Sequence, residues 1–189
     1  NTSYVEITTF FLVGMPGLEY AHIWIFIHTC RMYLIAILGN CISLFVIKTE
    51  LPLHEPMYYL LSTLAMSDTS LSLSSLPTMW QIFLLNAPEI SADACFAQEF
   101  FIHGFTVFES LVLLIISFDC FLDIHSPLRY SSILTPIRVA RIGTTFFFKS
   151  FLLVLRFPFT LRSLKYCNKT QLSHSYCLHQ DVMKLACSD

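Results

Sequence analysis

The chain has 189 residues, of which 55% are hydrophobic and 13% are charged, and its mean hydropathy is +0.64. A soluble domain of ordinary composition carries about 25% charged residues, so this composition argues against a soluble fold and favours a protein that uses lipid as part of its solvent. The formal net charge of −2 favours neither a nucleic acid nor an acidic partner.

Four long apolar segments follow one another along the chain. Because a membrane-spanning helix needs about 20 mostly apolar residues, we predict helices at about residues 22–47, 57–85, 96–118 and 142–159, with an outer loop at 160–189. Arg31 interrupts the first segment, and Lys149 and Arg156 interrupt the fourth. The predicted fold class is an all-α membrane protein that forms a single partial domain over residues 1–189.

The second and third predicted helices each carry a carboxylic acid at membrane depth. Asp68 lies among serines and Glu109 lies in FFIHGFTVFESLVLLI. Ionisable groups at this depth are costly and usually face a protein interior or water. Two carboxylates at similar depth suggest a shared Na⁺ ion, which would offset their repulsion. The alternative, that each is protonated or hydrogen-bonded to a nearby serine, is equally compatible with the sequence.

His103 lies near the outer end of the third helix. Thr106, Val107 and Ser110 follow it at the spacing of one helical face, and this face is placed to line a pocket. The alternative is a histidine that bonds to a neighbour inside the bundle.

Basic residues in the short links predict the orientation. Lys48 follows the first helix, and Arg129, Arg138 and Arg141 follow the third, which puts the N-terminus outside. The basic residues after Leu161 weaken this argument. Two glycosylation sequons, which begin at Asn1 and Asn168, then lie outside as well.

Seven cysteines divide into two groups under this topology. Cys95, Cys167, Cys177 and Cys187 lie in the oxidising outer compartment, where pairing is expected, and the spacing leaves all three connectivities open. The other cysteines are predicted to be free thiols: Cys30, Cys41 and Cys120.

Neither a metal enzyme nor a hydrolase is indicated. His174, Cys177, His179 and Asp181 are of metal-binding types, but no second Cys/His pair has zinc-finger spacing. The chain has no GxSxG, HExxH or phosphate-binding glycine loop, and Cys120 with His125 has weak geometry for a thiol–imidazole pair. We therefore predict no catalytic activity, no metal beyond a Na⁺ at Asp68 and Glu109, and no cofactor besides that ion.

Several stretches together carry a family resemblance. Gly39-Asn40, LHEPMYYLLSTLAMSD (53–68) and SPLRY (126–130) resemble the odorant receptors, which are rhodopsin-like, seven-helix, G-protein-coupled receptors. FFIHGFTVFES (100–110) and SHSYCLHQDVMKLAC (173–187) resemble their class I, fish-like branch. The resemblance implies the first four helices and outer loop of a seven-helix bundle in the plasma membrane. It also implies a small hydrophilic, often carboxylic odorant, a heterotrimeric G protein and membrane lipid as partners.

The resemblance also implies roles for particular residues. Cys95 is expected to pair with Cys177, and Cys167 with Cys187. Asp68 and Glu109 match the intramembrane acidic pair and Na⁺ site of the family. The expected ligand-binding residues are His103, Thr106, Val107, His179 and Gln180.

The chain departs from the family where the third helix ends, at SFDCFLDIHSPLRY (117–130). Asp119 and Phe121 of the coupling motif are kept, but Cys120 replaces the arginine that meets the G protein, and Cys has neither its reach nor its charge. Asp123 adds a further acid, and the sequence stops before three expected helices. Two hypotheses remain: an odorant receptor that signals through a G protein, or a non-signalling, truncated remnant that lacks helices five to seven.

Overall fold

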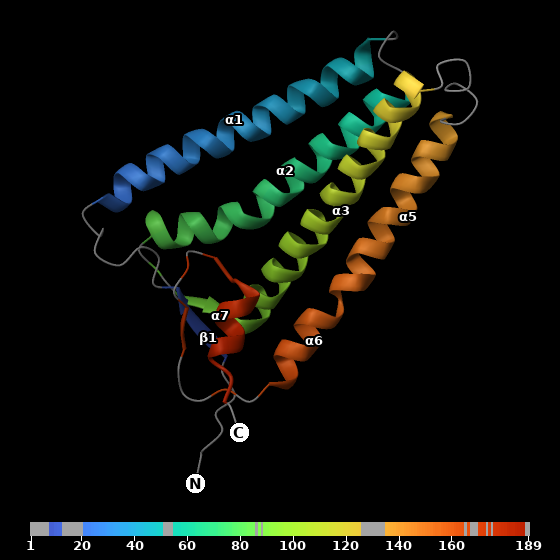
Figure 1. Cartoon of the computed structure of the whole chain (residues 1–189). Helices are drawn as coiled ribbons and strands as arrows, with labels where there is room; N and C mark the ends of the chain where they lie inside the picture. The colour runs from blue at the N-terminus through green and yellow to red at the C-terminus, as the bar shows by residue number, and fades with distance from the viewer. Residues whose placement is uncertain are drawn as a thin grey trace. The chain divides into compact units, whose positions relative to one another are not determined.

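The computed structural model describes residues 8–12, 21–50, 55–85, 87, 89–125, 135–164, 166, 170–172, 174 and 176–187. Long helices dominate the described chain (Figure 1), which agrees with the predicted all-α class. They are α1 (His22–Thr49), α2 (Pro56–Phe83), α3 (Ala92–His125) and α5 (Pro136–Val154), which is followed by the short α6 (Arg156–Ser163).

Three helical stretches are long and apolar enough to cross a membrane: His22–Thr49, Ala92–His125 and Pro136–Ser163. α2 has the length of a spanning helix, 28 residues, but its many serines and Asp68 lower its hydropathy. No residue of α1 is buried, and large apolar side chains such as Trp24, Ile35 and Phe45 are exposed. Such a surface suits lipid rather than water.

Two helices differ in extent from the prediction. α3 begins at Ala92 and runs to His125, instead of covering 96–118, because polar residues mark the edge of the apolar stretch without breaking the helix. The predicted helix 142–159 consists of α5 and α6, separated by a turn at Leu155. Pro158 lacks an N–H and its ring clashes with the carbonyl four residues earlier, which explains why α5 ends at Val154.

Contacts divide the described chain into two compact units. The first unit comprises residues 1–33, 73–103 and 154–189, and the second comprises 34–72 and 104–153. Each unit is built from parts of the same long helices.

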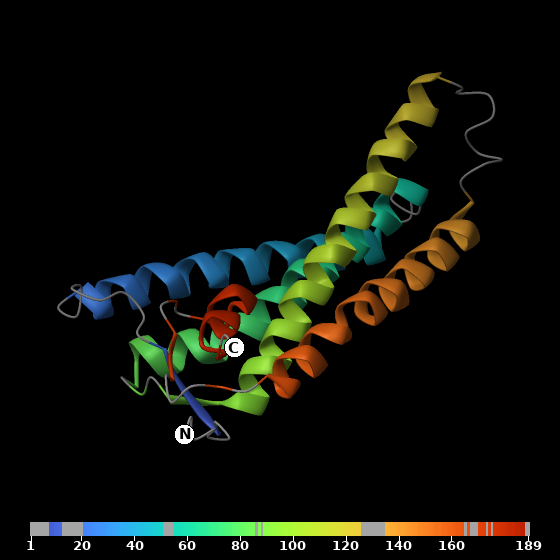
Figure 2. The ribbon, with the colours of Figure 1, turned by 60° about the horizontal axis from the view of Figure 1, so that its bottom comes forward.

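The first unit contains a small sheet that the sequence analysis did not predict. Its order is β2-β1-β3, in which β1 (Thr9–Leu12) pairs antiparallel with β2 (Glu89–Ser91) and parallel with β3 (Gln171–Leu172). The short helix α7 (His179–Lys184) lies beside this sheet (Figures 1 and 2). Strands β1 and β3 are therefore held beside the N-terminal end of α3, which directly follows β2.

Apolar side chains from the sheet, the helices and the loop form one core in this unit. Phe10 is fully buried, and its ring makes edge contacts with Phe96 and Tyr166. Leu161, Leu172 and Val182 are buried in the same cluster. Burying side chains of this size contributes about 1.5–3 kcal/mol each, which holds these described residues of the 160–189 segment in the core.

The second unit has a smaller core, which contains Leu60, Ile115 and Val139. Gly104 faces the Phe151 ring so closely that a Cβ atom there would lie 2.5 Å from the ring carbon Cε1. Glycine therefore permits this close approach of α3 and α5.

Candidate ligand-binding site

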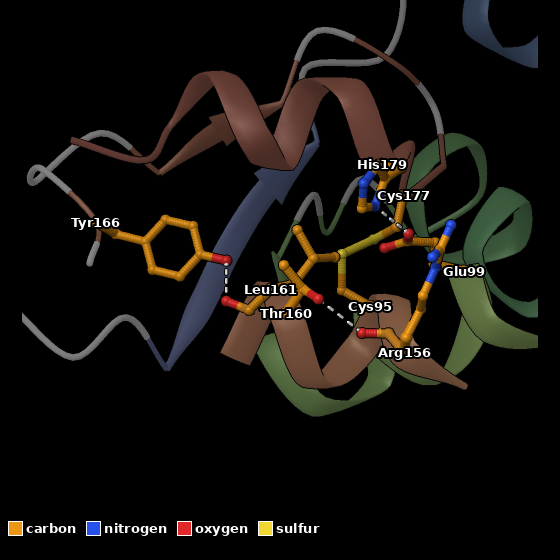
Figure 3. A network of polar contacts seen from close by, with 8 residues as sticks. All are labelled: Cys95, Glu99, Arg156, Thr160, Leu161, Tyr166, Cys177 and His179. Atoms are coloured by element: carbon orange, nitrogen blue, oxygen red, sulfur yellow. Dashed lines mark hydrogen bonds and ion pairs between the residues drawn. A yellow bond between two sulfur atoms is a disulfide. The ribbon is translucent and has the colours of Figure 1, made fainter. Parts of the chain in front are cut away.

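A disulfide links the segment that follows α6 to the first turns of α3. Cys95 bonds to Cys177, which is 82 residues away in sequence, and both are buried. This is the pair that the resemblance implied (Figure 3). Cys187 is also disulfide-bonded, and its expected partner Cys167 lies outside the described residues.

A set of hydrogen bonds around Gln98 lies beside the disulfide. The backbone N–H of Cys177 donates to Oε1 of Gln98 at 3.3 Å, and Nε2 of Gln98 donates to Oγ1 of Thr78 at 2.7 Å and to the carbonyl of Ser74 at 3.2 Å. The loop segment around Cys177 is thus hydrogen-bonded through α3 to α2.

The first residue of α7 contacts a buried acid of α3. Nδ1 of His179 donates to Oε1 of Glu99 at 2.6 Å (Figure 3). The Glu99 side chain is 1% exposed, whereas that of His179 is 23% exposed. Glu99 follows Cys95 by about one helical turn, so the disulfide and the ion pair lie on the same face of α3.

Two imidazoles share one aromatic neighbour. The ring centroid of Phe157 lies 5.0 Å from that of His179 and 5.9 Å from that of His103. The guanidinium carbon of Arg156 lies 5.5 Å from the same centroid. The structure thus brings together two of the predicted ligand-binding residues, around an aromatic side chain that the sequence did not indicate.

The other predicted ligand-binding residues are placed differently. Gln180 is exposed in the first turn of α7, next to His179. Thr106 and Val107 belong to the second unit, where Thr106 is exposed and its carbonyl accepts a hydrogen bond from Ser110. Thr106 and Val107 follow His103 along α3, so they remain on the predicted helical face.

Hydrogen bonds between charged groups also stabilise α7. Asp181 is 4% exposed and accepts hydrogen bonds from His174 and from Nζ of Lys184, the latter at 3.0 Å. Burial raises the pKa of Asp181, but the hydrogen bonds from His174 and Lys184 outweigh it, so this pKa lies below its usual value. Burial and the nearby Glu99 carboxylate raise the pKa of Tyr166 to about 12.

The four metal-type residues of the outer loop do not converge. His174 bonds to Asp181, Cys177 is in the disulfide, and His179 bonds to Glu99. Within the described part of the chain, no group of three His, Cys, Asp or Glu side chains could hold a metal ion.

The intramembrane acids meet in the second unit. The carboxyl groups of Asp68 and Glu109 lie close enough to interact. Oε1 of Glu109 and Oγ of Ser67 are buried without a hydrogen-bond partner among the described residues. Asp68 also lines a cavity of about 420 Å³, together with Asn40 of α1. An oxygen-only donor set with unsatisfied atoms fits a hard cation.

The comparisons with known proteins decide the family. A profile described as olfactory receptor matches residues 29–189. The chain belongs to the olfactory receptor family. It is 79% identical over 189 residues to olfactory receptor 51A4 of Homo sapiens, 78% identical over 189 residues to olfactory receptor 51A2, and 68% identical over 184 residues to olfactory receptor 51A7, both of Homo sapiens.

These matches cover 97–100% of the chain and 59–60% of each relative, so the chain spans about 60% of their length. The similarity to the 51 group agrees with the class I branch of rhodopsin-like receptors. The family is one of membrane receptors and not of enzymes.

The residues that the resemblance assigns to the coupling motif lie within α3. Asp119 is 2% exposed, whereas Cys120 is an exposed free thiol. Phe121 is exposed, and its ring stacks on that of His125 at 5.3 Å. The other sequence motifs at Asn1, Asn168 and 126–130 lie outside the described residues.

Glu99 and Phe157 are the site residues that the sequence analysis missed. Glu99 had a usable signal, since it lies four residues after Cys95 and four before His103, which puts all three on one face of α3. Phe157 had none, because it is one of eighteen phenylalanines in the chain.

Proposed function

We propose that this chain forms part of a class I odorant receptor that detects small hydrophilic, carboxylic odorants and signals through a heterotrimeric G protein. The receptor lies in the plasma membrane with its N-terminus outside. The observation that carries the proposal is the pair of imidazoles, His103 and His179, around Phe157. An acid needs hydrogen-bond donors for its oxygens and apolar contact for its carbon chain, and this cluster offers both.

In this mechanism the odorant bridges α3 and the outer loop. His103 and His179 hydrogen-bond to the carboxyl group, Phe157 packs against the carbon chain, and Gln180 completes this part of the pocket. A bound acid stabilises the receptor state in which these groups converge, and that preference shifts the population toward the G-protein-binding state. Asp68 and Glu109 would hold a Na⁺ ion that offsets the repulsion between their charges.

Dose–response curves of a complete receptor that contains this sequence test the proposal. Cells that express it are given straight-chain carboxylic acids and the matching alcohols, and cyclic AMP and surface delivery are measured. We expect His103→Ala and His179→Ala each to lower the potency of the acid by roughly tenfold, because a hydrogen bond to a charged group contributes about 1.5–3 kcal/mol. His28→Ala in α1 is the matched control. Potencies that equal the wild type in both variants would contradict the proposal.

A second candidate function is a receptor that binds an odorant without coupling to a G protein. The observation that favours it is Cys120, an exposed thiol where the family has an arginine, with the exposed acid Asp123 one turn later. Odorant binding without a cyclic-AMP response, in a receptor delivered to the cell surface, would support this function over the first.

A further inference from the structure

Glu99 is a buried acid with no role in the mechanism above. Its side chain is 1% exposed, Oε1 is bonded to His179, and Oε2 is buried without a hydrogen-bond partner among the described residues. A buried carboxylate is costly unless it is paired. The interaction with His179 is therefore what keeps this charge inside the protein.

The backbone of His179 is held independently of Glu99. Cys177, two residues earlier, is anchored by the disulfide to Cys95 and by the hydrogen bond to Gln98. These contacts fix where the His179 backbone lies but leave the orientation of its ring open. Glu99 and Phe157 both contact the ring.

The two contacts leave one part of the imidazole available. Phe157 packs against the ring with the two planes tilted by 41°, and Glu99 occupies Nδ1 at 2.6 Å. Nε2 is the remaining nitrogen, and the side chain keeps 23% of its surface exposed.

We infer that Glu99 is a positioning residue of the odorant site: its buried side chain holds His179 by Nδ1, so that Nε2 is turned toward the carboxyl group of an acid odorant. This inference rests on the proposed function. Glu99 sets the preference for acids over alcohols without touching the ligand.

Potency ratios test this role. In the complete receptor, Glu99→Gln should lower the potency of hexanoic acid by roughly tenfold, equivalent to about 1.4 kcal/mol, and leave that of 1-hexanol nearly unchanged. Gln has the size of Glu but is a weaker hydrogen-bond acceptor than a carboxylate. Asp93→Asn is the matched control, because it removes an exposed acid from the same end of α3. An equal loss for acid and alcohol would overturn the inference, since a merely structural role predicts it.

A double-mutant cycle shows whether Glu99 acts through His179. In a His179→Ala background, Glu99→Gln should cause no further loss of acid preference; an additive loss would overturn the inference. If Glu99→Gln alone is not delivered to the surface, the double variant Glu99→Gln with His179→Gln should restore delivery, because it leaves no buried charge. Failure to restore it would count against the pairing.

Chemical modification tests the inference without any odorant. Diethyl pyrocarbonate reacts with an imidazole nitrogen, and the hydrogen bond to Glu99 occupies Nδ1 and restrains the ring, so His179 in the purified receptor should be modified several-fold faster in Glu99→Gln than in the wild type. His174, paired with Asp181 in the same loop, is the internal reference. Equal modification rates of His179 in the variant and the wild type would overturn the role of Glu99. Faster modification in a receptor that does not respond to acids would refute the proposed function but leave the Glu99–His179 pairing intact.

Discussion

Cys120 is the single residue with the largest expected effect on coupling. Its side chain is exposed near the end of α3, beside the buried Asp119. Cys120→Arg in the complete receptor should raise the odorant-driven cyclic-AMP response by roughly tenfold, since a hydrogen bond to a charged group contributes about 1.5–3 kcal/mol. Cys120→Ser, which adds no charge, is the control. An unchanged response at equal surface expression would contradict this reading of the position.

Asp181 makes the stability of the outer loop depend on pH. The pKa of Asp181 is lowered in the folded protein, so its contribution is present above the unfolded pKa of about 3.9 and is lost as the pH falls through the lower folded value. Asp181→Asn should therefore destabilise the protein by about 1 kcal/mol at pH 7 and by almost nothing below the folded pKa.

Thermal unfolding of the two proteins at both pH values measures this difference. Asp93→Asn should lower the melting temperature little at either pH, because Asp93 and its partner Arg162 are both largely exposed. A deficit of Asp181→Asn that persists unchanged at low pH would show that the charge of Asp181 is not its cause.

The residues of the site were predictable only where a motif or a family pattern marked them. The resemblance paired Cys95 with Cys177 and grouped His103 with His179. The structure bonds the two cysteines to each other and places both imidazoles near the Phe157 ring. The Glu99–His179 contact joins positions 80 residues apart. The spacing puts Glu99 on the face of α3 that carries Cys95 and His103, but an acid near the end of an apolar helix usually marks the edge of the membrane, so no local pattern indicates that its side chain is buried.

At the scale of elements, the close approach of α3 and α5 depends on one glycine. A Cβ at Gly104 would overlap the Phe151 ring, which is itself packed against Phe105 and Phe147. Gly104→Ala should therefore destabilise the protein by about 1–3 kcal/mol, the usual cost of overpacking, less the gain in helix propensity.

Gly143 of α5 supplies the matched control. Nothing lies within 4 Å of a Cβ built there, so Gly143→Ala should be neutral or stabilise the helix by up to about 1 kcal/mol. Melting temperatures of the two purified variants should shift in opposite directions. Equal shifts would show that the Phe151 ring moves aside at little cost.

Element boundaries were less predictable than the elements themselves. Hydropathy marks the lipid-facing stretch, whereas α3 extends beyond it at both ends because Asp93 and Asp123 are compatible with a helix. The break at Leu155 follows from Pro158, which the sequence displays. Strand β1 has four residues, and its partners lie about 80 and 160 positions away along the chain, so no local pattern indicates it.

At the scale of the whole molecule, the outer loop and the N-terminal strand depend on a link between distant parts of the chain. The Cys95–Cys177 bridge closes a loop of 82 residues, and the chain-entropy account assigns such a bridge about 4–5 kcal/mol. That is comparable to the whole stability of a marginal protein. The sheet, α7 and the Glu99–His179 pair all lie in the unit that this bridge fastens.

Cys95→Ala should therefore abolish delivery of the complete receptor to the cell surface, as measured by labelling an N-terminal tag on intact cells and normalising to total protein. Cys177→Ala should have the same effect, and the double variant should be no worse than either, because one bond is lost in all three. Cys41→Ala, at an exposed free thiol of α1, should be delivered normally. If Cys95→Ala alone reached the surface in normal amounts, the strand pairing of β1 and the apolar core around Phe10 would suffice to hold the loop. The role of the bridge would then be confined to placing His179 against Glu99, and acid potency rather than delivery would report its loss.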